Sequence, residues 1–400
     1  MSEVLRPRRT LATPGRGIAR IIALAFTCAG AANAATVSVG PDERIRTIAE
    51  AAAAAKDGDV VEIAAGTYTG DVAVWLQRRL TIRGVGGRPV LAANGHVAEG
   101  KAIWVLRNGD FTVQNIAFQG ARAVDRNGAG IRFERGRLRV VDCTFADNEN
   151  GILTGNDAAS ELLVERSEFS HAPRDVGPLK HLIYVGRIGH FSLSGSRVHD
   201  GFEGHLVKSR ARLSDIRYNL LFDGPGGRAA YELEFPNGGA AYVVGNVIGQ
   251  SATTTNPVVV SYGAEGRAWP DNALFLSHNT LVSDYSRGAW FLRVWSANFT
   301  EGLKLKAVNN LTVGLGLFEL AAPGDFQGNH SAFGSALSDP EILDFRLRMS
   351  DRWHFSVDKA EDVDGVALAP AAEFALPLGT RPLSSVVKWA PGAFQDAAAH

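Results

Sequence analysis

The 400-residue chain has only two cysteines and two methionines, and its formal net charge is −1. Because there is no excess of Lys and Arg, nothing in the charge points to nucleic acid or to an anionic membrane surface as a partner. Cys28 lies in an apolar N-terminal stretch and would leave with a signal peptide, so Cys143 alone would remain. No internal disulfide is then expected, even in an oxidising compartment.

Long apolar runs are also scarce, and the one at residues 21–31 is too short to cross a bilayer. Five arginines between residues 6 and 20 precede it, and Ala32-Asn33-Ala34 follows it as a small-x-small cleavage site. This order predicts a secretory signal peptide over residues 1–34, cleaved near Ala34. We therefore expect a secreted or periplasmic protein without a membrane span.

Helical periodicity is rare after residue 60, whereas short strand-like runs recur. Four of these runs carry the pattern Asn-x-aliphatic at intervals of about 30 residues, and they begin at Asn219, Asn246, Asn279 and Asn309. Earlier runs have small residues in the same position, namely Cys143, Ser167 and Ser196. A repeat of this length made of strands predicts a parallel β-solenoid, an all-β fold. Cys143 should then be a buried small residue and not a nucleophile.

The repeat divides the chain after the signal peptide into three parts. Residues 35–79 should form an N-terminal cap and first coil, with an amphipathic helix over residues 41–56 that covers the open end. Residues 80–330 should form the parallel β-helix coils. In each coil a further strand follows a variable loop; these strands begin near residues 151, 181, 205, 231, 258, 291 and 317. Residues 331–400 lose the repeat and are expected to form a C-terminal cap and tail.

The entry to the coils resembles the opening of the pectin lyase-like superfamily. It contains Ile48 and Ala51, then Gly58-Asp59, then Gly66-Thr67-Tyr68. The Asn-x-aliphatic repeats match the asparagine ladder of that superfamily, and the likeness covers residues 36–396. It implies a single-stranded right-handed parallel β-helix with an N-terminal capping helix and an irregular C-terminal cap. The superfamily includes lyases, hydrolases, esterases, epimerases and non-catalytic adhesins, so the resemblance does not choose an activity.

Several well-known motifs of the superfamily are missing from this sequence. The paired-Asp pattern of polygalacturonase-type hydrolases, the motif of pectin methylesterases and the Asp-Pro-His-Asp site of alginate epimerases have no match. Val198-His199-Asp200-Gly201 is only a superficial echo of the last of these. Lyase sites vary more in sequence, so a lyase remains open.

The strand around residues 204–211 is the strongest chemical candidate. If side chains alternate and Val207 faces the core, then Lys208 and Arg210 face outward. The strand before it then sends Tyr184 outward, and the strand after it sends Glu232 and Glu234 outward. Since neighbouring coils lie about 4.8 Å apart, these side chains should stack on one wall, with His181 and His205 nearby and Arg293 extending it.

These residue types suit β-elimination from a uronate, which requires a neutralised carboxylate and a base. We expect Lys208 to act as the base, Arg210 to bind the carboxylate, and Tyr184 or His205 to act as the acid. Substrate-binding roles are expected for His181, Glu232, Glu234 and Arg293, and the two glutamates could hold Ca²⁺ or orient Lys208. Trp269, Trp290 and Trp295 could stack on sugars or pack inside the coils.

Two classes of function remain open from the residues. The first is an exported polysaccharide lyase that cleaves an acidic, uronate-containing glycan. The second is a non-catalytic glycan-binding or envelope-associated β-helix, because stacked Lys, Arg and Glu side chains also form ordinary cross-strand ion pairs. In both cases we expect a monomer whose partner is a polysaccharide and not nucleic acid.

Overall fold

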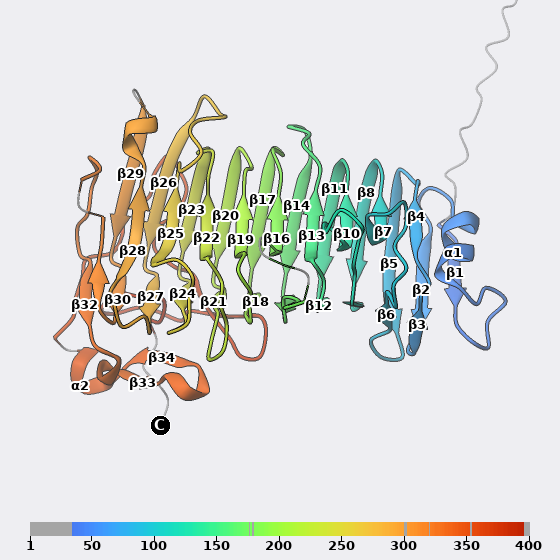
Figure 1. The fold of residues 1–400 in the computed structure, drawn as a ribbon. Helices are drawn as coiled ribbons and strands as arrows, with labels where there is room; N and C mark the ends of the chain where they lie inside the picture. The colour runs from blue at the N-terminus through green and yellow to red at the C-terminus, as the bar shows by residue number, and fades with distance from the viewer. Residues whose placement is uncertain are drawn as a thin grey trace, which may run out of the picture. The chain divides into compact units, whose positions relative to one another are not determined.

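The computed structural model describes residues 34–395 except residues 176, 178, 179, 300, 301, 320 and 353. The predicted signal peptide, residues 1–34, lies outside the described residues but for Ala34. The described chain makes about ten coils, and each coil adds one strand to each of three parallel sheets (Figure 1). The predicted β-helix is therefore confirmed. Its first strands already lie within residues 35–79.

The first sheet contains β1 (Thr36–Val39), β2 (Val60–Ala64), β5 (Arg79–Val85), β8 (Gly109–Gln114), β11 (Gly136–Val141), β14 (Glu161–Glu165), β17 (His190–Ser194), β20 (Leu213–Arg217), β23 (Ala240–Val244), β26 (Asn272–Ser277) and β29 (Leu303–Val308). The second sheet contains β4 (Ala73–Trp75), β7 (Ala102–Leu106), β10 (Ala129–Phe133), β13 (Asn150–Thr154), β16 (His181–Val185), β19 (His205–Ser209), β22 (Tyr231–Phe235), β25 (Val258–Tyr262), β28 (Ala289–Val294) and β31 (Gly316–Leu317). These are the strands predicted after the variable loops.

The third sheet contains β3 (Thr67–Thr69), β6 (Val90–Ala92), β9 (Ala117–Gln119), β12 (Thr144–Ala146), β15 (Glu168–Ser170), β18 (Arg197–Val198), β21 (Leu220–Phe222), β24 (Val247–Gln250), β27 (Thr280–Ser283), β30 (Leu311–Val313) and β32 (His330–Ala332). Inward-facing side chains of the three sheets form one continuous apolar core. Within it, Phe118, Phe145 and Phe169 stack in successive coils with ring centroids 4.9 and 4.6 Å apart.

The bend between the first and third sheets contains the ladder. In this bend the backbone N–H of Ser196 donates to Oδ1 of Asn219 in the next coil, at 2.9 Å. The Asn219 N–H donates in turn to Asn246 Oδ1 at 2.9 Å, so each amide satisfies a backbone donor of the preceding coil. Cys143 is fully buried in the same series, as predicted, and its N–H donates to Ser167 Oγ.

One ladder position differs from the prediction. The residue before each ladder position has a left-handed backbone, and Asn309 is such a residue, with φ of 58°. Asn310 is therefore the ladder residue, and its Oδ1 accepts from the N–H of Asn279 at 2.9 Å. The series also continues to Asn329, which accepts from the Asn310 N–H. Asn tolerates the left-handed region better than most residues, which is why two adjacent asparagines can share the bend.

The N-terminal end is covered by α1 (Ile48–Ala54), which is shorter than the predicted helix over residues 41–56. Thr47 starts the helix through a capping box with Glu50, and Asp71 accepts from the N–H groups of Ile48 and Ala49. Ile48 and Ala51 are fully buried in the core. The helix thus closes the first coil as expected for a solenoid cap.

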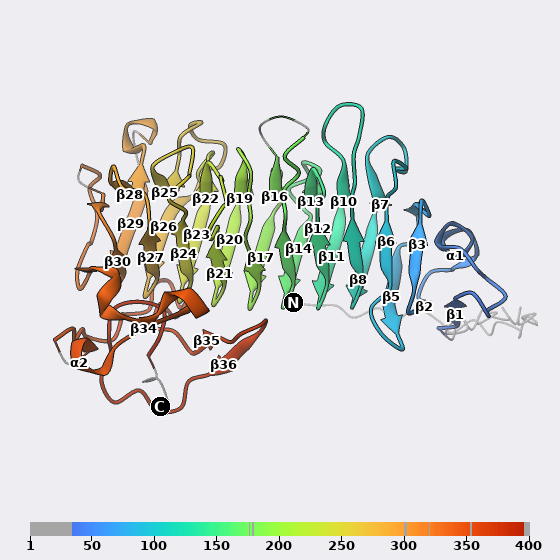
Figure 2. The ribbon, with the colours of Figure 1, turned by 60° about the horizontal axis from the view of Figure 1, so that its bottom comes forward.

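The segment after the coils contains β33 (Leu337–Asp339), β34 (Asp344–Leu347), α2 (Met349–Arg352), β35 (Ala372–Phe374) and β36 (Thr380–Pro382). Its apolar side chains, including Phe345 and Phe394, pack against the outer side of the third sheet at Leu220, Val247 and Leu311. Figure 2 shows this segment beneath the later coils. Among the described residues, no helix is both long and apolar enough to cross a membrane.

Candidate functional site

The outer face of the second sheet carries the predicted residues in one row. Tyr184, Lys208 and Glu234 are direct register partners on β16, β19 and β22. The row continues through Ser261 on β25 to Arg293 on β28. The structure therefore brings Tyr184, Lys208, Glu234 and Arg293 to one face, and their chemical roles stay predictions.

Lys208 lies between two carboxylates. Its Nζ is 3.1 Å from Glu234 Oε2 and 3.1 Å from Glu265 Oε1, and the residue is only 8% exposed. The Lys208 ammonium group is thus held in two ion pairs with protein carboxylates, and its predicted role as the base stays a prediction. Glu265 was missed from the sequence because it lies in the loop between β25 and β26, 57 residues after its partner.

Arg210, which follows β19, has its donors directed at protein groups. Its guanidinium donates to Glu265 at 2.6 and 3.1 Å and to Asn237. Its Nε donates to the Tyr184 hydroxyl at 3.0 Å. The Arg210 side chain is thus engaged, and a carboxylate ligand would have to compete with Glu265. What the arginine does offer is positive charge beside the Tyr184 oxygen.

His181 and His205 lie beside this row and stack on each other, with ring centroids 4.6 Å apart. Burial, followed by the charges of Lys208 and Arg210, lowers the pKa of His181 to about 3. Burial and the neighbouring His181 also hold the pKa of His205 well below its usual value. Both rings are therefore neutral at neutral pH. The His205 backbone N–H donates to His181 Nδ1 at 3.1 Å, so the ring proton of His181 is on Nε2.

Glu232 corrects the sequence prediction, because it does not lie on the outer wall. It is 0% exposed, and within the described part of the chain neither carboxylate oxygen has a hydrogen-bond partner. Leu206 and Val207 are both in the core, which shows that two consecutive residues face inward where the second-sheet strands begin. Glu232 occupies the position one coil beyond Leu206. Burial, and then the charge of Asp223, raise the pKa of Glu232 well above its usual value.

The predicted Ca²⁺ site at Glu232 and Glu234 is not formed by these side chains. Glu232 lies inside the coil, whereas Glu234 pairs with Lys208 outside it. Burial raises the pKa of Glu234, and nearby Lys208 opposes that effect. Across the described ranges, no group of three or more His, Cys, Asp or Glu side chains is arranged to hold a metal ion.

A polar hollow of about 400 Å³ adjoins the row on its N-terminal side. It lies over β10, β13 and β16, and its lining includes Arg132, Asn150, His181 and Tyr184. Lys101 also lines it and pairs with Glu134 at 3.0 Å, as does Arg132 at 3.3 Å. The hollow therefore combines cationic, amide and hydroxyl groups on the same sheet face as the predicted residues.

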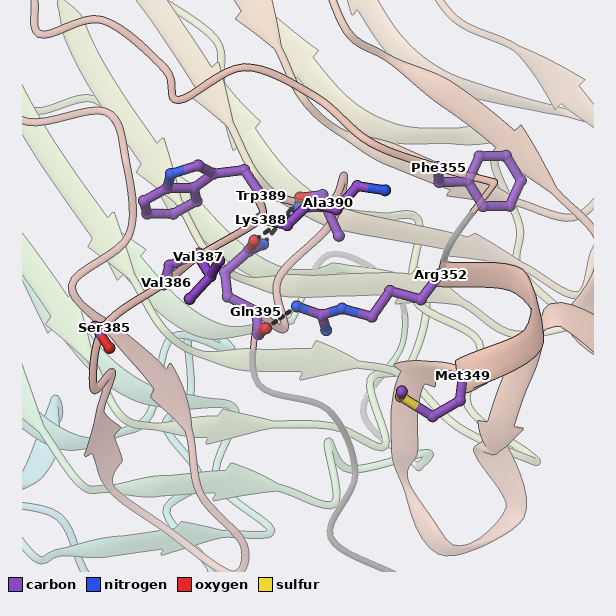
Figure 3. A pocket seen from close by; sticks show the side chains of 10 residues that line it. All are labelled: Met349, Arg352, Phe355, Ser385, Val386, Val387, Lys388, Trp389, Ala390 and Gln395. Carbon is purple, nitrogen blue, oxygen red and sulfur yellow. Dashed lines mark hydrogen bonds between the residues drawn. The ribbon is translucent and has the colours of Figure 1, made fainter.

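A second hollow, of about 250 Å³, lies within the C-terminal segment (Figure 3). Met349, Val387 and Trp389 are among its lining residues, and Arg352 donates to the Gln395 carbonyl at its edge. It contains none of the predicted site residues. Because its lining is more apolar and it offers few groups for acid–base chemistry, the second sheet remains the candidate site.

His199, from the Val198–Gly201 segment compared above with the alginate epimerase motif, forms an ion-pair cluster beside the third sheet. Its Nε2 is 3.0 Å from Glu168 and its Nδ1 is 2.9 Å from Asp200. Burial alone would lower the pKa of His199, but hydrogen bonds to Asp200 and Glu168 outweigh it and raise that pKa. The cluster lies on a different sheet from the candidate site.

Comparisons with known proteins bear on the fold. No protein-family model matches the chain, and no curated protein matches it. The pectate lyase Pel9A is similar in structure, with a TM-score of 0.55 and 14% identity over 90% of this chain and 96% of that one. A pectin methylesterase from Aspergillus niger matches with a TM-score of 0.30 and 11% identity, over 83% of this chain and 93% of that one. The described chain is a right-handed parallel β-helix of the pectin lyase-like fold.

Proposed function

We propose that this protein is an exported polysaccharide lyase that cleaves an acidic, uronate-containing glycan by β-elimination. The observation that carries the proposal is the position of Tyr184. Its side chain lines the polar hollow, and its hydroxyl accepts a hydrogen bond from Arg210 Nε at 3.0 Å. This hydrogen bond fixes the hydroxyl at the edge of the hollow, where it can exchange a proton with a bound sugar.

The proposed reaction assigns separate tasks to separate residues. A base removes the proton from the carbon next to the uronate carboxylate, the bond to the leaving glycosidic oxygen breaks, and a carbon–carbon double bond forms. The Tyr184 oxygen takes this proton and gives it to the leaving glycosidic oxygen, while the cations of the hollow, Arg132 and Lys101, neutralise the carboxylate. Lys208 and Glu265 hold Arg210 and Tyr184 in place. His181, neutral and protonated on Nε2, can donate a hydrogen bond to the sugar.

A panel of uronate polymers, followed by ultraviolet absorbance of the unsaturated product, tests the proposal. Tyr184→Phe removes only the hydroxyl and should lower the rate by roughly 10²–10⁴-fold. Arg132→Ala should lower it too, whereas Arg137→Ala, an exposed arginine of the first sheet, serves as the matched control. Full activity of Tyr184→Phe would refute the role of Tyr184. Full activity of Lys208→Ala would show that the row containing Lys208 is not part of the active site.

A non-catalytic glycan-binding or envelope-associated β-helix is the second candidate. It is favoured by the ion pairs that already engage Lys208 and Arg210 with Glu234 and Glu265. Retention on an affinity gel of one polymer, with no unsaturated product from any polymer, would select this alternative over the lyase.

A further inference from the structure

Arg293 differs from the other arginines of the second-sheet row. Arg132 and Arg210 are paired with glutamates, whereas Arg293 has no hydrogen bond or ion pair with any residue in the described part of the chain. Its side chain is exposed, so its five N–H donors are available to a ligand. The neighbouring Val294 donates its backbone N–H to Glu319 Oε2 at 2.7 Å.

Two indole rings hold Arg293 in place. Its guanidinium carbon lies 5.4 Å from the ring centroid of Trp290 and 4.8 Å from that of Trp295. Both distances are within the range of cation–π attraction, which stabilises the guanidinium without using its N–H groups. An arginine fixed in this way is preorganised to bind a carboxylate with two parallel hydrogen bonds.

Ser261 supplies a second, independent observation. It is the register partner of Arg293 in the same outward row, it is 0% exposed, and its Oγ has no hydrogen-bond partner among the residues that the structure describes. A buried hydroxyl without a partner costs about 1–3 kcal/mol, so the cluster carries an unmet polar group beside an unpaired cation. A bound sugar carboxylate would satisfy the exposed Arg293 directly, and a sugar hydroxyl would reach Ser261 where the side chains that cover it move aside.

We propose that Trp290, Arg293 and Ser261, with Trp295 behind the arginine, form a carbohydrate subsite that binds the carboxylate of a uronate. This inference rests on the proposed function and deepens it by adding a distant contact on the same glycan. Arg293 on β28 is four strand spacings from Tyr184 on β16, which is a span of about 19 Å. A glycan that runs along the coils would bridge the two positions only if it had about four or more sugar residues.

Binding by oligomers of defined length tests the subsite. The probes are oligogalacturonates and oligoalginates of about two and about six sugar residues, chosen around the ~19 Å span, with the dissociation constant measured by calorimetry. Tyr184→Phe serves as the background so that ligands stay intact. Adding Arg293→Gln should weaken binding of the longer oligomer by roughly tenfold or more and leave the shorter one, bound at the hollow, unchanged. Arg137→Gln is the control, and thermal melting confirms that each variant is folded.

The outcomes separate this inference from the function on which it rests. If the starting protein binds a longer oligomer and Arg293→Gln binds it equally well, the subsite is wrong while the glycan site stands. If Arg293→Gln weakens binding of the shorter and the longer oligomer equally, the inference that Arg293 contacts the glycan far from Tyr184 is wrong. If the protein neither binds nor cleaves any uronate polymer or oligomer, the proposed function fails and the subsite fails with it.

Discussion

Lys208 on β19 and Glu234 on β22 are register partners whose Nζ and Oε2 atoms lie 3.1 Å apart, and they are only 8% and 3% exposed. Removing one partner of such a pair leaves a buried charge without compensation. Lys208→Ala should therefore lower the free energy of unfolding by about 3–5 kcal/mol, measured with denaturant. The Lys208→Ala/Glu234→Ala double variant should recover part of this loss.

The control for that pair is Lys304 with Asp364, whose side chains are 65% and 64% exposed. Lys304→Ala should cost only about 0–1 kcal/mol, because water screens an exposed pair. Equal costs for Lys208→Ala and Lys304→Ala would show that burial does not strengthen the pair on the second sheet.

Glu232 should make the protein less stable as the pH rises. Its pKa in the folded protein is raised above the usual value of 4.5, so its contribution is fully present below that value and is lost as the pH increases through the raised pKa. Glu232→Gln keeps the shape and removes the ionisation. It should equal the wild type in acid and become increasingly more stable than the wild type at higher pH, measured by denaturant unfolding. Glu161→Gln on β14, where the side chain is 44% exposed, is the control.

The ion pairs of His199 should also contribute less to stability as the pH rises. The raised pKa of His199 means that its ion pairs stabilise the fold fully below its usual pKa of 6.5 and lose that effect as the pH rises through the raised value. The lowered pKa values of Glu168 and Asp200 keep the pairs intact down to acidic pH. The cost of His199→Gln should thus be larger at about pH 5.5 than at about pH 9. A cost that grows with pH would contradict the assignment; the exposed His96→Gln is the control.

Asn246 should be sensitive to loss of its amide. Its Oδ1 accepts from the Asn219 N–H at 2.9 Å, and its Nδ2 donates to the Ile216 carbonyl at 2.8 Å. Asn246→Leu leaves both buried groups unpaired and should cost roughly 2–5 kcal/mol in denaturant unfolding. Asn246→Ser should cost less, because a serine at a ladder position still accepts, as Ser196 does from the Ser167 N–H. Similar costs for Leu and Ser would mean that packing, and not hydrogen bonding, sets the preference.

The fold and one row of the site could be predicted because both follow from local periodicity. The ladder spacing fixes the coil, and strand alternation then places Tyr184, Lys208 and Arg293 on one face. The assignment of Asn309 to the ladder failed because Asn309 fits the pattern Asn-x-aliphatic through Leu311, whereas the true ladder residue, Asn310, is followed two residues later by Thr312.

The rest of the site depends on features that alternation does not contain. Glu232 turns inward because the chain rounds a corner where its strand begins, so that two neighbouring residues face the core. Glu265 reaches Lys208 and Arg210 from a loop two coils further on, and the loop's path is set by tertiary packing. The polar hollow depends likewise on loops whose length varies from coil to coil.

The C-terminal segment touches coils that are far apart along the axis. Gly379 donates to the Gly195 carbonyl, the Tyr218 hydroxyl accepts from Ala371, and Ala393 donates to Thr280. In a solenoid each coil otherwise contacts only its neighbours, and coils at an end can fray one after another. Because the C-terminal segment is hydrogen-bonded to several coils, these coils should unfold together. The later half of the β-helix should therefore resist stepwise unravelling by proteases or by mechanical pulling better than the earlier half.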